Sequence, residues 1–196
     1  MRARDIMSTP AVTTTPGTDV RAAEKTLVQK GFTALPVTED DRLVGLLSEA
    51  DLLADRFPEQ PHRPHGTVGE VMSTAVKTID IDTDAAQIAR LMLDARLRCL
   101  PVLDRGAVAG VVTRRDFLRV LARPDDKLGE DVSRRLSVFG PADRWIVDVA
   151  DGEATIIDRF ASEKDHEVAV VLAESVPGII RAQCYVGEAE HARERS

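Results

Sequence analysis

An internal duplication constrains this chain more than any other feature of its sequence. Residues 5–53 and 70–118 align without a gap at a constant offset of 65. The triplet Met7-Ser8-Thr9 returns as Met72-Ser73-Thr74. Because so many identities in one register rarely arise by chance, the alignment indicates one structural unit present in two copies.

Each copy shows the same order of expected elements, which is strand, helix, strand, strand, helix. Thr18 and Thr83, each followed by Asp, are the expected N-caps of the first helices. One unit of about 50 residues buries little apolar surface, so we expect the two copies to pack sheet to sheet as a pseudo-twofold pair in an α+β fold. The expected elements are 11–14, 18–30, 34–38, 43–47 and 49–56 in the first copy and 76–79, 83–95, 99–103, 108–112 and 114–122 in the second.

A short motif closes each copy, at residues 45–51 and 110–116. Both read as a Gly, two apolar residues, a hydroxyl residue, two further residues and an Asp. The hydroxyl residue stands where a helix begins, and unpaired N–H groups at a helix start favour an anion. Such a corner could hold a phosphate and a sugar diol. The same pattern is also close to a capping box, which stabilises a helix by about 1 kcal/mol without any ligand.

The charges beside the two corners differ. Glu49 follows Ser48 and would repel a phosphate, whereas Arg114 and Arg115 follow Thr113 and would attract one. We therefore expect the second corner to be the stronger anion site. The alternative is that both arginines point into solvent or pair with Asp104 or Asp116.

The pattern changes after Pro124. The order expected there is helix, strand, strand, helix, strand, with Asp151-Gly152 as the hairpin turn and Pro177-Gly178 as the end of the second helix. The expected helices are 127–138 and one that begins at Ser162, and the expected strands are 145–149, 154–157 and 179–186. The whole chain is expected to divide into 1–57 (first copy), 58–67 (Pro-rich linker), 68–123 (second copy), 124–188 (small α+β domain) and 189–196 (charged tail).

Composition excludes several classes of function. A net charge of -7 and an aromatic content of 4% argue against nucleic-acid binding. We expect a cytoplasmic protein, because the chain shows no secretory signal, no apolar run long enough to span a bilayer, and only the distant cysteines Cys99 and Cys184. His62 and His65 are expected to be solvated loop residues rather than metal ligands, and Cys99 a buried residue rather than a reactive thiol. No catalytic nucleophile with a base stands out, so we expect no enzyme.

The duplicated half, about residues 2–122, resembles a tandem pair of CBS domains, known as a Bateman module. The resemblance rests on the Asp-Ile-Met-Ser and Glu-Val-Met-Ser openings, the Leu-Pro-Val strands and the two corners. It implies binding of an adenosyl ligand (AMP, ADP, ATP or S-adenosylmethionine), with the corner hydroxyl on phosphate and the Asp on the ribose hydroxyls. The implied stronger site comprises Thr78, Cys99, Pro101, Thr113, Arg114, Arg115 and Asp116, and the weaker one Thr13, Ala34, Pro36, Ser48 and Asp51.

Residues 126–187 resemble a BON domain, although Asp158 stands where many such domains carry a second Gly. Together the resemblances imply a regulatory nucleotide sensor that forms a homodimer through the helices 18–30 and 83–95 and needs no cofactor, with the role of Mg²⁺ left open. The sensor's output would be dimer packing or the BON-like domain. The alternative is a dimeric adaptor without a ligand, whose BON-like domain docks a protein partner or a phospholipid surface.

Overall fold

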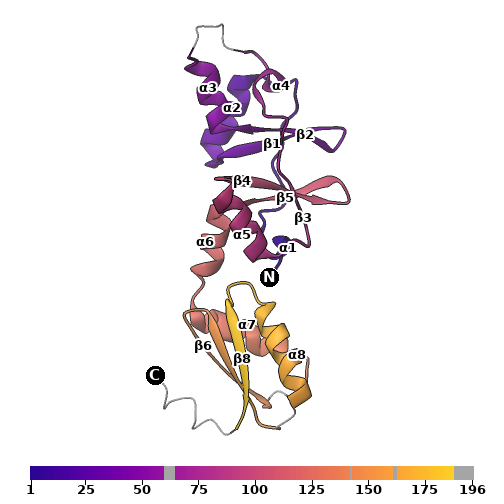
Figure 1. Cartoon of the computed structure of the whole chain (residues 1–196), viewed down its shortest axis with the longest axis vertical. Helices are drawn as coiled ribbons and strands as arrows, with labels where there is room; N and C mark the ends of the chain where they lie inside the picture. Colours follow the sequence, from indigo (N-terminus) through magenta and orange to yellow (C-terminus); the bar gives the residue numbers. More distant parts are fainter. Residues whose placement is uncertain (60–64, 142, 161–162, 188–196) are drawn as a thin grey trace. The chain divides into compact units, whose positions relative to one another are not determined.

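The structure, a computed structural model, describes residues 1–59, 65–141, 143–160 and 163–187. The chain divides into two compact units, residues 2–116 and the residues from Phe117 onward, with the boundary inside one helix. The first unit contains most of the duplicated half and the second contains the C-terminal domain (Figure 1). Among the described helices, none has both the length and the apolar character that a membrane span needs.

Apart from the opening strand, the two copies have the expected order of helices and strands, preceded in each case by one short helical turn. In the first copy these are α1 (Ala3–Ile6), α2 (Val20–Lys30), β1 (Ala34–Glu39), β2 (Arg42–Ser48) and α3 (Glu49–Arg56). In the second copy these are α4 (Val68–Val71), β3 (Ile79–Asp80), α5 (Ala85–Asp94), β4 (Cys99–Asp104), β5 (Ala107–Thr113) and α6 (Arg114–Leu121).

The expected opening strands are largely absent. No strand forms over 11–14, where Thr14 alone bridges Val37, and the second copy keeps only the two-residue β3. Pro10 and Pro16 flank the first segment and have no N–H to donate to a ladder, so pairing there is limited to one residue.

The caps of the first helices were also expected one residue too early. Asp19 and Asp84 are the N-caps, and their carboxylates accept hydrogen bonds from Ala22 N at 3.1 Å and Ala86 N at 2.9 Å. Thr18 instead accepts a bond from Thr15 N within the preceding turn. A carboxylate adds favourable charge at a helix start, so Asp is the better cap of the two neighbouring candidates.

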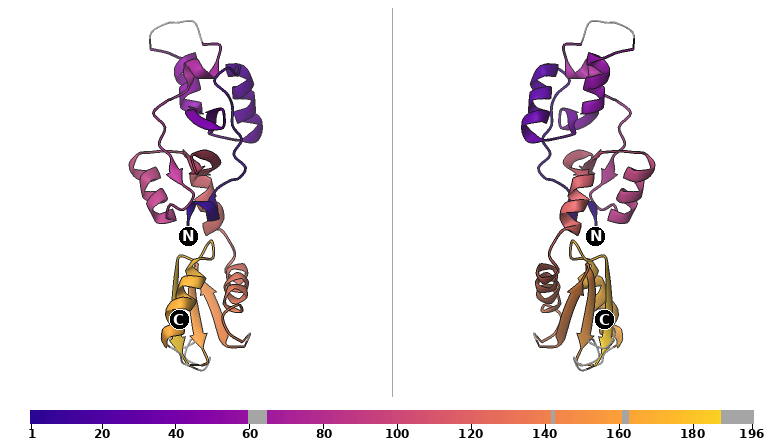
Figure 2. Two further views of the ribbon diagram at one scale, coloured as in Figure 1. Left: turned by 90° about the vertical axis from the view of Figure 1, so that its right-hand side faces the viewer. Right: turned by 90° about the vertical axis from the view of Figure 1, so that its left-hand side faces the viewer.

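One five-stranded sheet runs through the first unit in the order β1-β2-β5-β4-β3. Each copy contributes an antiparallel hairpin, and the two hairpins join through a single antiparallel pairing of Arg42 with Ala107. The two copies therefore share one continuous sheet, whereas we expected two sheets packed face to face. Figures 1 and 2 show α2 and α3 beside the β1–β2 hairpin, where Leu27, Leu35, Leu47 and other buried residues form a core.

The opening turn of each copy packs on the other copy. The N–H of Ala3 in α1 donates to Thr83 O at 2.8 Å, and the N–H of Val68 in α4 donates to Thr18 O at 2.9 Å. Val68 is fully buried in the core of the first copy. The two copies are therefore linked by a reciprocal exchange, in which the N-terminal segment of each copy forms its hydrogen bonds with the other copy.

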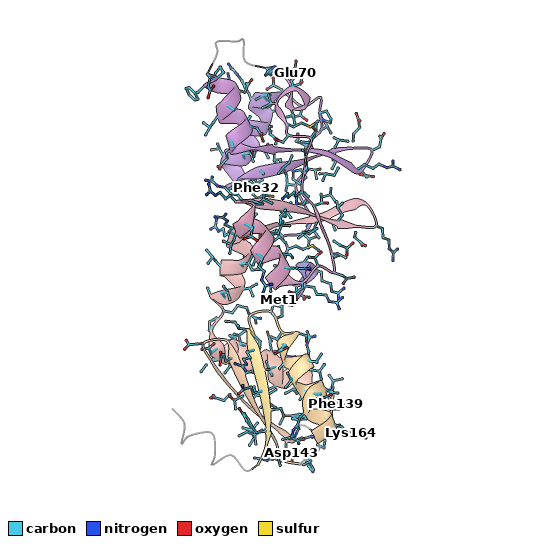
Figure 3. The ribbon with its side chains drawn as sticks, in the orientation of Figure 1. Met1, Phe32, Glu70, Phe139, Asp143 and Lys164 are labelled. Carbon is cyan, nitrogen blue, oxygen red and sulfur yellow. The ribbon has the colours of Figure 1, made fainter. Side chains whose placement is uncertain are left out.

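The C-terminal unit has the expected order α-β-β-α-β. Its elements are α7 (Asp125–Leu136), β6 (Trp145–Ala150), β7 (Glu153–Asp158), α8 (Glu163–Glu174) and β8 (Arg181–Val186). The sheet order is β6-β7-β8, with β6 and β7 antiparallel and β7 and β8 parallel. Leu128, Val132, Leu136 and Ile156 are buried between α7, α8 and the sheet, with Phe139 (labelled in Figure 3) packed against them.

Some boundaries in this unit differ from the expected ones. Helix α7 begins at Asp125 instead of 127, because Pro124 suits a helix start and the acidic residues Asp125 and Asp126 favour the first turn. Strand β8 begins at Arg181 instead of 179, since Ile179 N donates back to Val176 O in a turn. Ser162, residues 60–64 of the linker and the expected tail 189–196 lie outside the described residues.

Candidate functional site

The two corners have the same internal geometry, and both carboxylates cap the helix in which they lie. At the first corner the Ser48 N–H and hydroxyl donate to Asp51 Oδ2 at 2.7 and 2.5 Å. At the second the Thr113 N–H and hydroxyl donate to Asp116 Oδ2 at 2.7 and 2.6 Å. The capping interpretation of the motif is therefore realised in this structure. In both corners these bonds are made to Oδ2, and the other carboxylate oxygen is Oδ1.

That second oxygen is bonded by a serine from the opposite copy. Ser73 Oγ donates to Asp51 Oδ1 at 2.9 Å, and Ser8 Oγ donates to Asp116 Oδ1 at 2.9 Å. Backbone pairing holds each serine in place, because Ser8 N donates to Val111 O at 2.9 Å and Ser73 N donates to Leu46 O at 3.0 Å. Sequence reasoning missed both serines as site residues. The repeated Met-Ser-Thr triplet was their only signal.

The motif glycines make room for these crossing segments. A Cβ on Gly110 would lie 2.8 Å from Ser8 O and 2.9 Å from Met7 Sδ. A Cβ on Gly45 would meet the movable Met72 sulfur and would lie 3.1 Å from Ser73 O. Real Cβ atoms do not approach a backbone oxygen as closely as 2.8 Å, so Gly110 is required by the other copy's backbone, whereas the fit at Gly45 is tight but less strict.

The arginines of the second corner divide between two environments. Arg114 turns away from the corner, because its Nε donates to Leu97 O at 3.2 Å and its Nη2 to Met92 O at 3.3 Å, beside the C-terminal end of α5. A cation there satisfies terminal carbonyls and complements the helix dipole. Arg115 is exposed, and the part of the chain that the structure describes offers it no hydrogen bond or ion pair.

An ion pair changes the charge beside the first corner. Arg98 Nη1 lies 3.7 Å from Glu49 Oε2, and both side chains are exposed. The pair links the segment before β4 to the first turn of α3. Because exposed pairs are weak and screened, Glu49 still makes the first corner the more acidic of the two.

The other expected site residues lie on the strands beside the corners. Ala34 is the register partner of Ser48, and Cys99 is the register partner of Thr113. Pro36 and Pro101 lie two residues further along the same strands. The structure thus brings Ala34 and Cys99 beside their corners, whereas Thr13 and Thr78 lie on exposed segments before α2 and β3.

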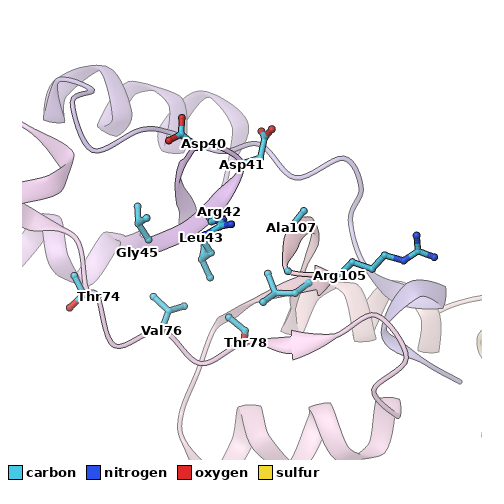
Figure 4. Close-up of a pocket in the computed structure, with 13 residues that line it drawn as sticks. Asp40, Asp41, Arg42, Leu43, Gly45, Thr74, Val76, Thr78, Arg105 and Ala107 are labelled. Carbon is cyan, nitrogen blue, oxygen red and sulfur yellow. The ribbon is translucent and has the colours of Figure 1, made fainter.

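A cavity of about 700 Å³ opens on the first unit between the two hairpin turns (Figure 4). Of the expected site residues only Thr78 lines it, and neither corner carboxylate does. The remaining lining residues are Asp40, Asp41, Arg42, Leu43, Val44, Gly45, Thr74, Val76, Leu103, Arg105, Gly106 and Ala107. Its size falls within the range of small-molecule sites, and it adjoins the segment that leads into β3.

Cys99 has the burial that was expected of it. Its side chain is 6% exposed, and burial raises the pKa of its thiol to about 12, with a further contribution from the charge of Asp116. Because the thiolate is the reactive form, this raised pKa disfavours reaction at Cys99 at neutral pH. It contributes volume beside Thr113 instead of chemistry.

The described residues contain no group of three or more potential metal ligands. His65 Nδ1 lies 2.6 Å from Asp55 Oδ1, which ties the end of the linker to α3. His62, the other histidine considered, lies outside the described residues.

These features define a class of protein, the tandem CBS pair. The model of the CBS domain family matches residues 3–56 and 68–123, and the chain belongs to that family. The residues after Arg123 lie outside both matches.

Three similar proteins show the range of the resemblance. The uncharacterized protein MJ1225 of Methanocaldococcus jannaschii is 28% identical over 130 residues, which are 60% of this chain and 46% of that protein. The chain thus spans about half the length of that relative. The crystal structure of CBSX2 in complex with AMP shares 30% identity at a TM-score of 0.55, covering 60% of this chain and 94% of the crystallised chain.

A third comparison is the CBS domain pair of protein MJ0100, in complex with 5′-methylthioadenosine and S-adenosyl-L-methionine. It shares 25% identity at a TM-score of 0.55 and covers 61% of this chain and 94% of that pair. Two CBS pairs similar to this one therefore bind adenosyl ligands.

Proposed function

We propose that this protein is a regulatory sensor whose CBS pair binds an adenosyl ligand of the AMP or S-adenosylmethionine type. The observation that carries the proposal is the duplicated corner, in which a hydroxyl and a carboxylate meet at the start of a helix within a CBS pair. The AMP complex of CBSX2 and the S-adenosylmethionine complex of MJ0100 support this ligand class.

Each corner is assigned the same chemical roles. The helix N–H groups and the hydroxyl of Ser48 or Thr113 bind phosphate, and Asp51 or Asp116 accepts from the ribose hydroxyls. The strand residues beside the corners, Ala34 and Cys99 with the prolines that follow, frame the base. Thr13 and Thr78 close the respective clefts from the preceding segments.

The second corner is proposed as the tighter site. Arg115 lies in the first turn of α6 and is available to a phosphate, whereas the first corner carries Glu49. Arg114 supports the site indirectly, since its side chain is engaged with the carbonyls of Leu97 and Met92.

Replacing the second carboxylate is expected to weaken nucleotide binding. Loss of a hydrogen bond to a charged group corresponds to about 10- to 100-fold in affinity, so Asp116→Ala should raise the Kd for AMP by that factor. The matched variant Asp51→Ala should leave the tighter site unchanged. Calorimetric titration with AMP, ADP, ATP and S-adenosylmethionine, with and without Mg²⁺, measures both effects.

Both variants also lose a helix cap, worth about 1 kcal/mol, so a melting curve of each confirms that it is folded. Loss of binding in Asp51→Ala alone would reverse the assignment of the two sites. A wild-type protein that binds none of these ligands would contradict the sensor and leave the ligand-independent adaptor.

We also propose that the CBS pair forms a homodimer through its outer helices. Val28 on α2 is 82% exposed and Leu93 on α5 is 66% exposed, and the two are equivalent positions of the repeat. Leu53 on α3 and Leu118 on α6 form a second equivalent exposed pair. Apolar side chains repeated on outward faces are suited to a symmetric interface.

The double variant Val28→Glu, Leu93→Glu is therefore expected to be monomeric at concentrations at which the wild type is dimeric. Charges placed in an apolar interface lose hydration without gaining partners, which opposes association. Gln29→Glu, an exposed change on the same helix, is the control and should stay dimeric. Light scattering after size exclusion gives the masses, and a monomeric wild type would contradict the proposal.

The BON-like domain is proposed as the output of the sensor. It presents Ile180, Tyr185 and Val186 as exposed apolar side chains at and beside β8. These residues are suited to contact with a protein partner, and a phospholipid surface remains the alternative of the adaptor hypothesis.

A further inference from the structure

Two serines at the openings of the repeats bind the carboxylates that the proposed function assigns to the ribose. Ser8, in the opening segment of the first copy, bonds Asp116 of the second, and Ser73, in the opening segment of the second copy, bonds Asp51 of the first. Each carboxylate thus has Oδ2 engaged by its own corner and Oδ1 engaged by the other copy.

The second carboxylate is closed to a ligand in this arrangement. Asp116 is 1% exposed, so solvent and ligand do not reach it while Ser8 is in place. A ribose diol and a serine hydroxyl are the same kind of donor, and an ionised carboxylate only accepts. Oδ2 already accepts two bonds from Thr113, so a diol that bonds Asp116 would do so at Oδ1, the oxygen that Ser8 bonds.

We propose that Ser8 and Ser73 are internal competitors of the ribose hydroxyls, and that nucleotide binding displaces the serine of the opposite copy from the Asp. This inference rests on the proposed function and adds to it the residues that limit affinity. It also supplies a physical link between a ligand in one copy and the N-terminal segment that joins the two.

The link follows from the neighbours of the serine. Ser8 is paired with Val111 through two backbone hydrogen bonds, and Met7 lies against Gly110. Displacing the Ser8 hydroxyl therefore removes one side-chain bond from the segment through which α1 is held on the second copy. A ligand that breaks the Ser8–Asp116 bond weakens the attachment of this segment to the second copy. By thermodynamic reciprocity, any change that weakens this attachment increases the affinity for the ligand.

The two serines are expected to differ in strength. Asp51 is half-buried and Ser73 is exposed, whereas Asp116 is buried and Ser8 is half-buried. Water can replace the Ser73 hydroxyl more readily than the Ser8 hydroxyl. Removing Ser8 should therefore change affinity more than removing Ser73.

The test compares Ser8→Ala with wild type, using AMP and 2′,3′-dideoxy-AMP as calorimetric probes. Ser8→Ala is expected to bind AMP about tenfold more tightly, because the displaced bond no longer opposes binding. Binding of the dideoxy probe, which has no diol, should not change. Ser73→Ala should give a smaller gain for AMP at the other corner.

Thr9→Ala is the matched control on the same segment. The Thr9 hydroxyl donates to Ala109 O at 2.9 Å and does not contact either Asp, so its loss should leave AMP affinity unchanged. A second measurement uses the wild type alone. Hydrogen exchange at the amides of Ser8 and Val111 should become faster when AMP binds.

Several outcomes would overturn the inference. Weaker or unchanged AMP binding by Ser8→Ala would show that the serine does not compete, and an equal gain for both probes would show that the diol is not involved. If wild type and variants bind neither AMP nor 5′-methylthioadenosine, the proposed function itself fails. If AMP binds and slows exchange at Ser8, the function stands and the competition is wrong.

Discussion

Gly110→Ala should lower the free energy of unfolding of the CBS pair by about 2–3 kcal/mol, the cost of forcing atoms into a packed site. The added Cβ would lie 2.8 Å from the backbone oxygen of Ser8. That oxygen cannot move alone, because the Ser8 carbonyl accepts from Val111 N at 3.1 Å. The crossing segment must therefore shift as a whole, which weakens the contact between the copies.

Two other glycines provide a graded control. At Gly45 the shortest contact of an added Cβ is with the Met72 sulfur, the movable end of a flexible side chain, so Gly45→Ala should cost less. At Gly17 nothing lies within 4 Å of an added Cβ, so Gly17→Ala should change stability by no more than about 0.5 kcal/mol. Chemical denaturation followed by circular dichroism gives the order. Equal effects at Gly110 and Gly17 would contradict the role of the crossing segment.

The repeated glycine shows where sequence reasoning reached its limit. A constant offset of 65 identifies equivalent residues, and it correctly predicted the two hairpins and the helix that follows each of them. The offset is the same whether an opening segment packs on its own copy or on the other. The exchange of α1 and α4, and with it the partners Ser8 and Ser73, could therefore not be predicted from the alignment.

Arg114 illustrates a second limit. The sequence places it in the first turn of a helix, beside a possible phosphate. Its guanidinium instead reaches carbonyls that precede it by 17 and 22 residues in the chain. A long side chain with several donors forms hydrogen bonds with the nearest acceptors that lack a partner. Only the packing of α5 against the corner determines where those acceptors lie.

The caps show the opposite situation, in which two local signals compete. Thr and Asp stand side by side at both helix starts, and either type is a good cap. The structure uses Asp19 and Asp84. Element order was thus predictable from local patterns, whereas boundaries depended on the choice between adjacent residues.

Arg144 and Asp158 form a buried ion pair in the C-terminal unit. Asp158 is fully buried and accepts from Arg144 Nε at 2.8 Å and Arg144 Nη2 at 2.7 Å. The same guanidinium donates to Asp165 Oδ2 at 2.7 Å and stacks 4.3 Å from the centre of the Trp145 ring. These bonds raise the pKa of Arg144, so its charge is fixed at every accessible pH.

Asp158→Ala is therefore expected to destabilise the C-terminal unit by about 3 kcal/mol, because it leaves the buried Arg144 with Asp165 as its remaining carboxylate. Trp145 is the sole tryptophan of the chain and lies in this unit, so its fluorescence follows this transition. The circular dichroism of the CBS pair should persist beyond the midpoint of the fluorescence change.

Two further variants separate the ion pair from packing. The double variant Arg144→Met, Asp158→Leu removes both charges and keeps apolar volume, so it should be more stable than Asp158→Ala. Glu130→Ala, which removes an exposed partner of Lys127, should leave the fluorescence midpoint unchanged. If the double variant were as unstable as the single one, the uncompensated charge of Arg144 would not account for the effect. The loss of another bond to Asp158, such as the one from the Phe160 N–H at 2.9 Å, would then account for it.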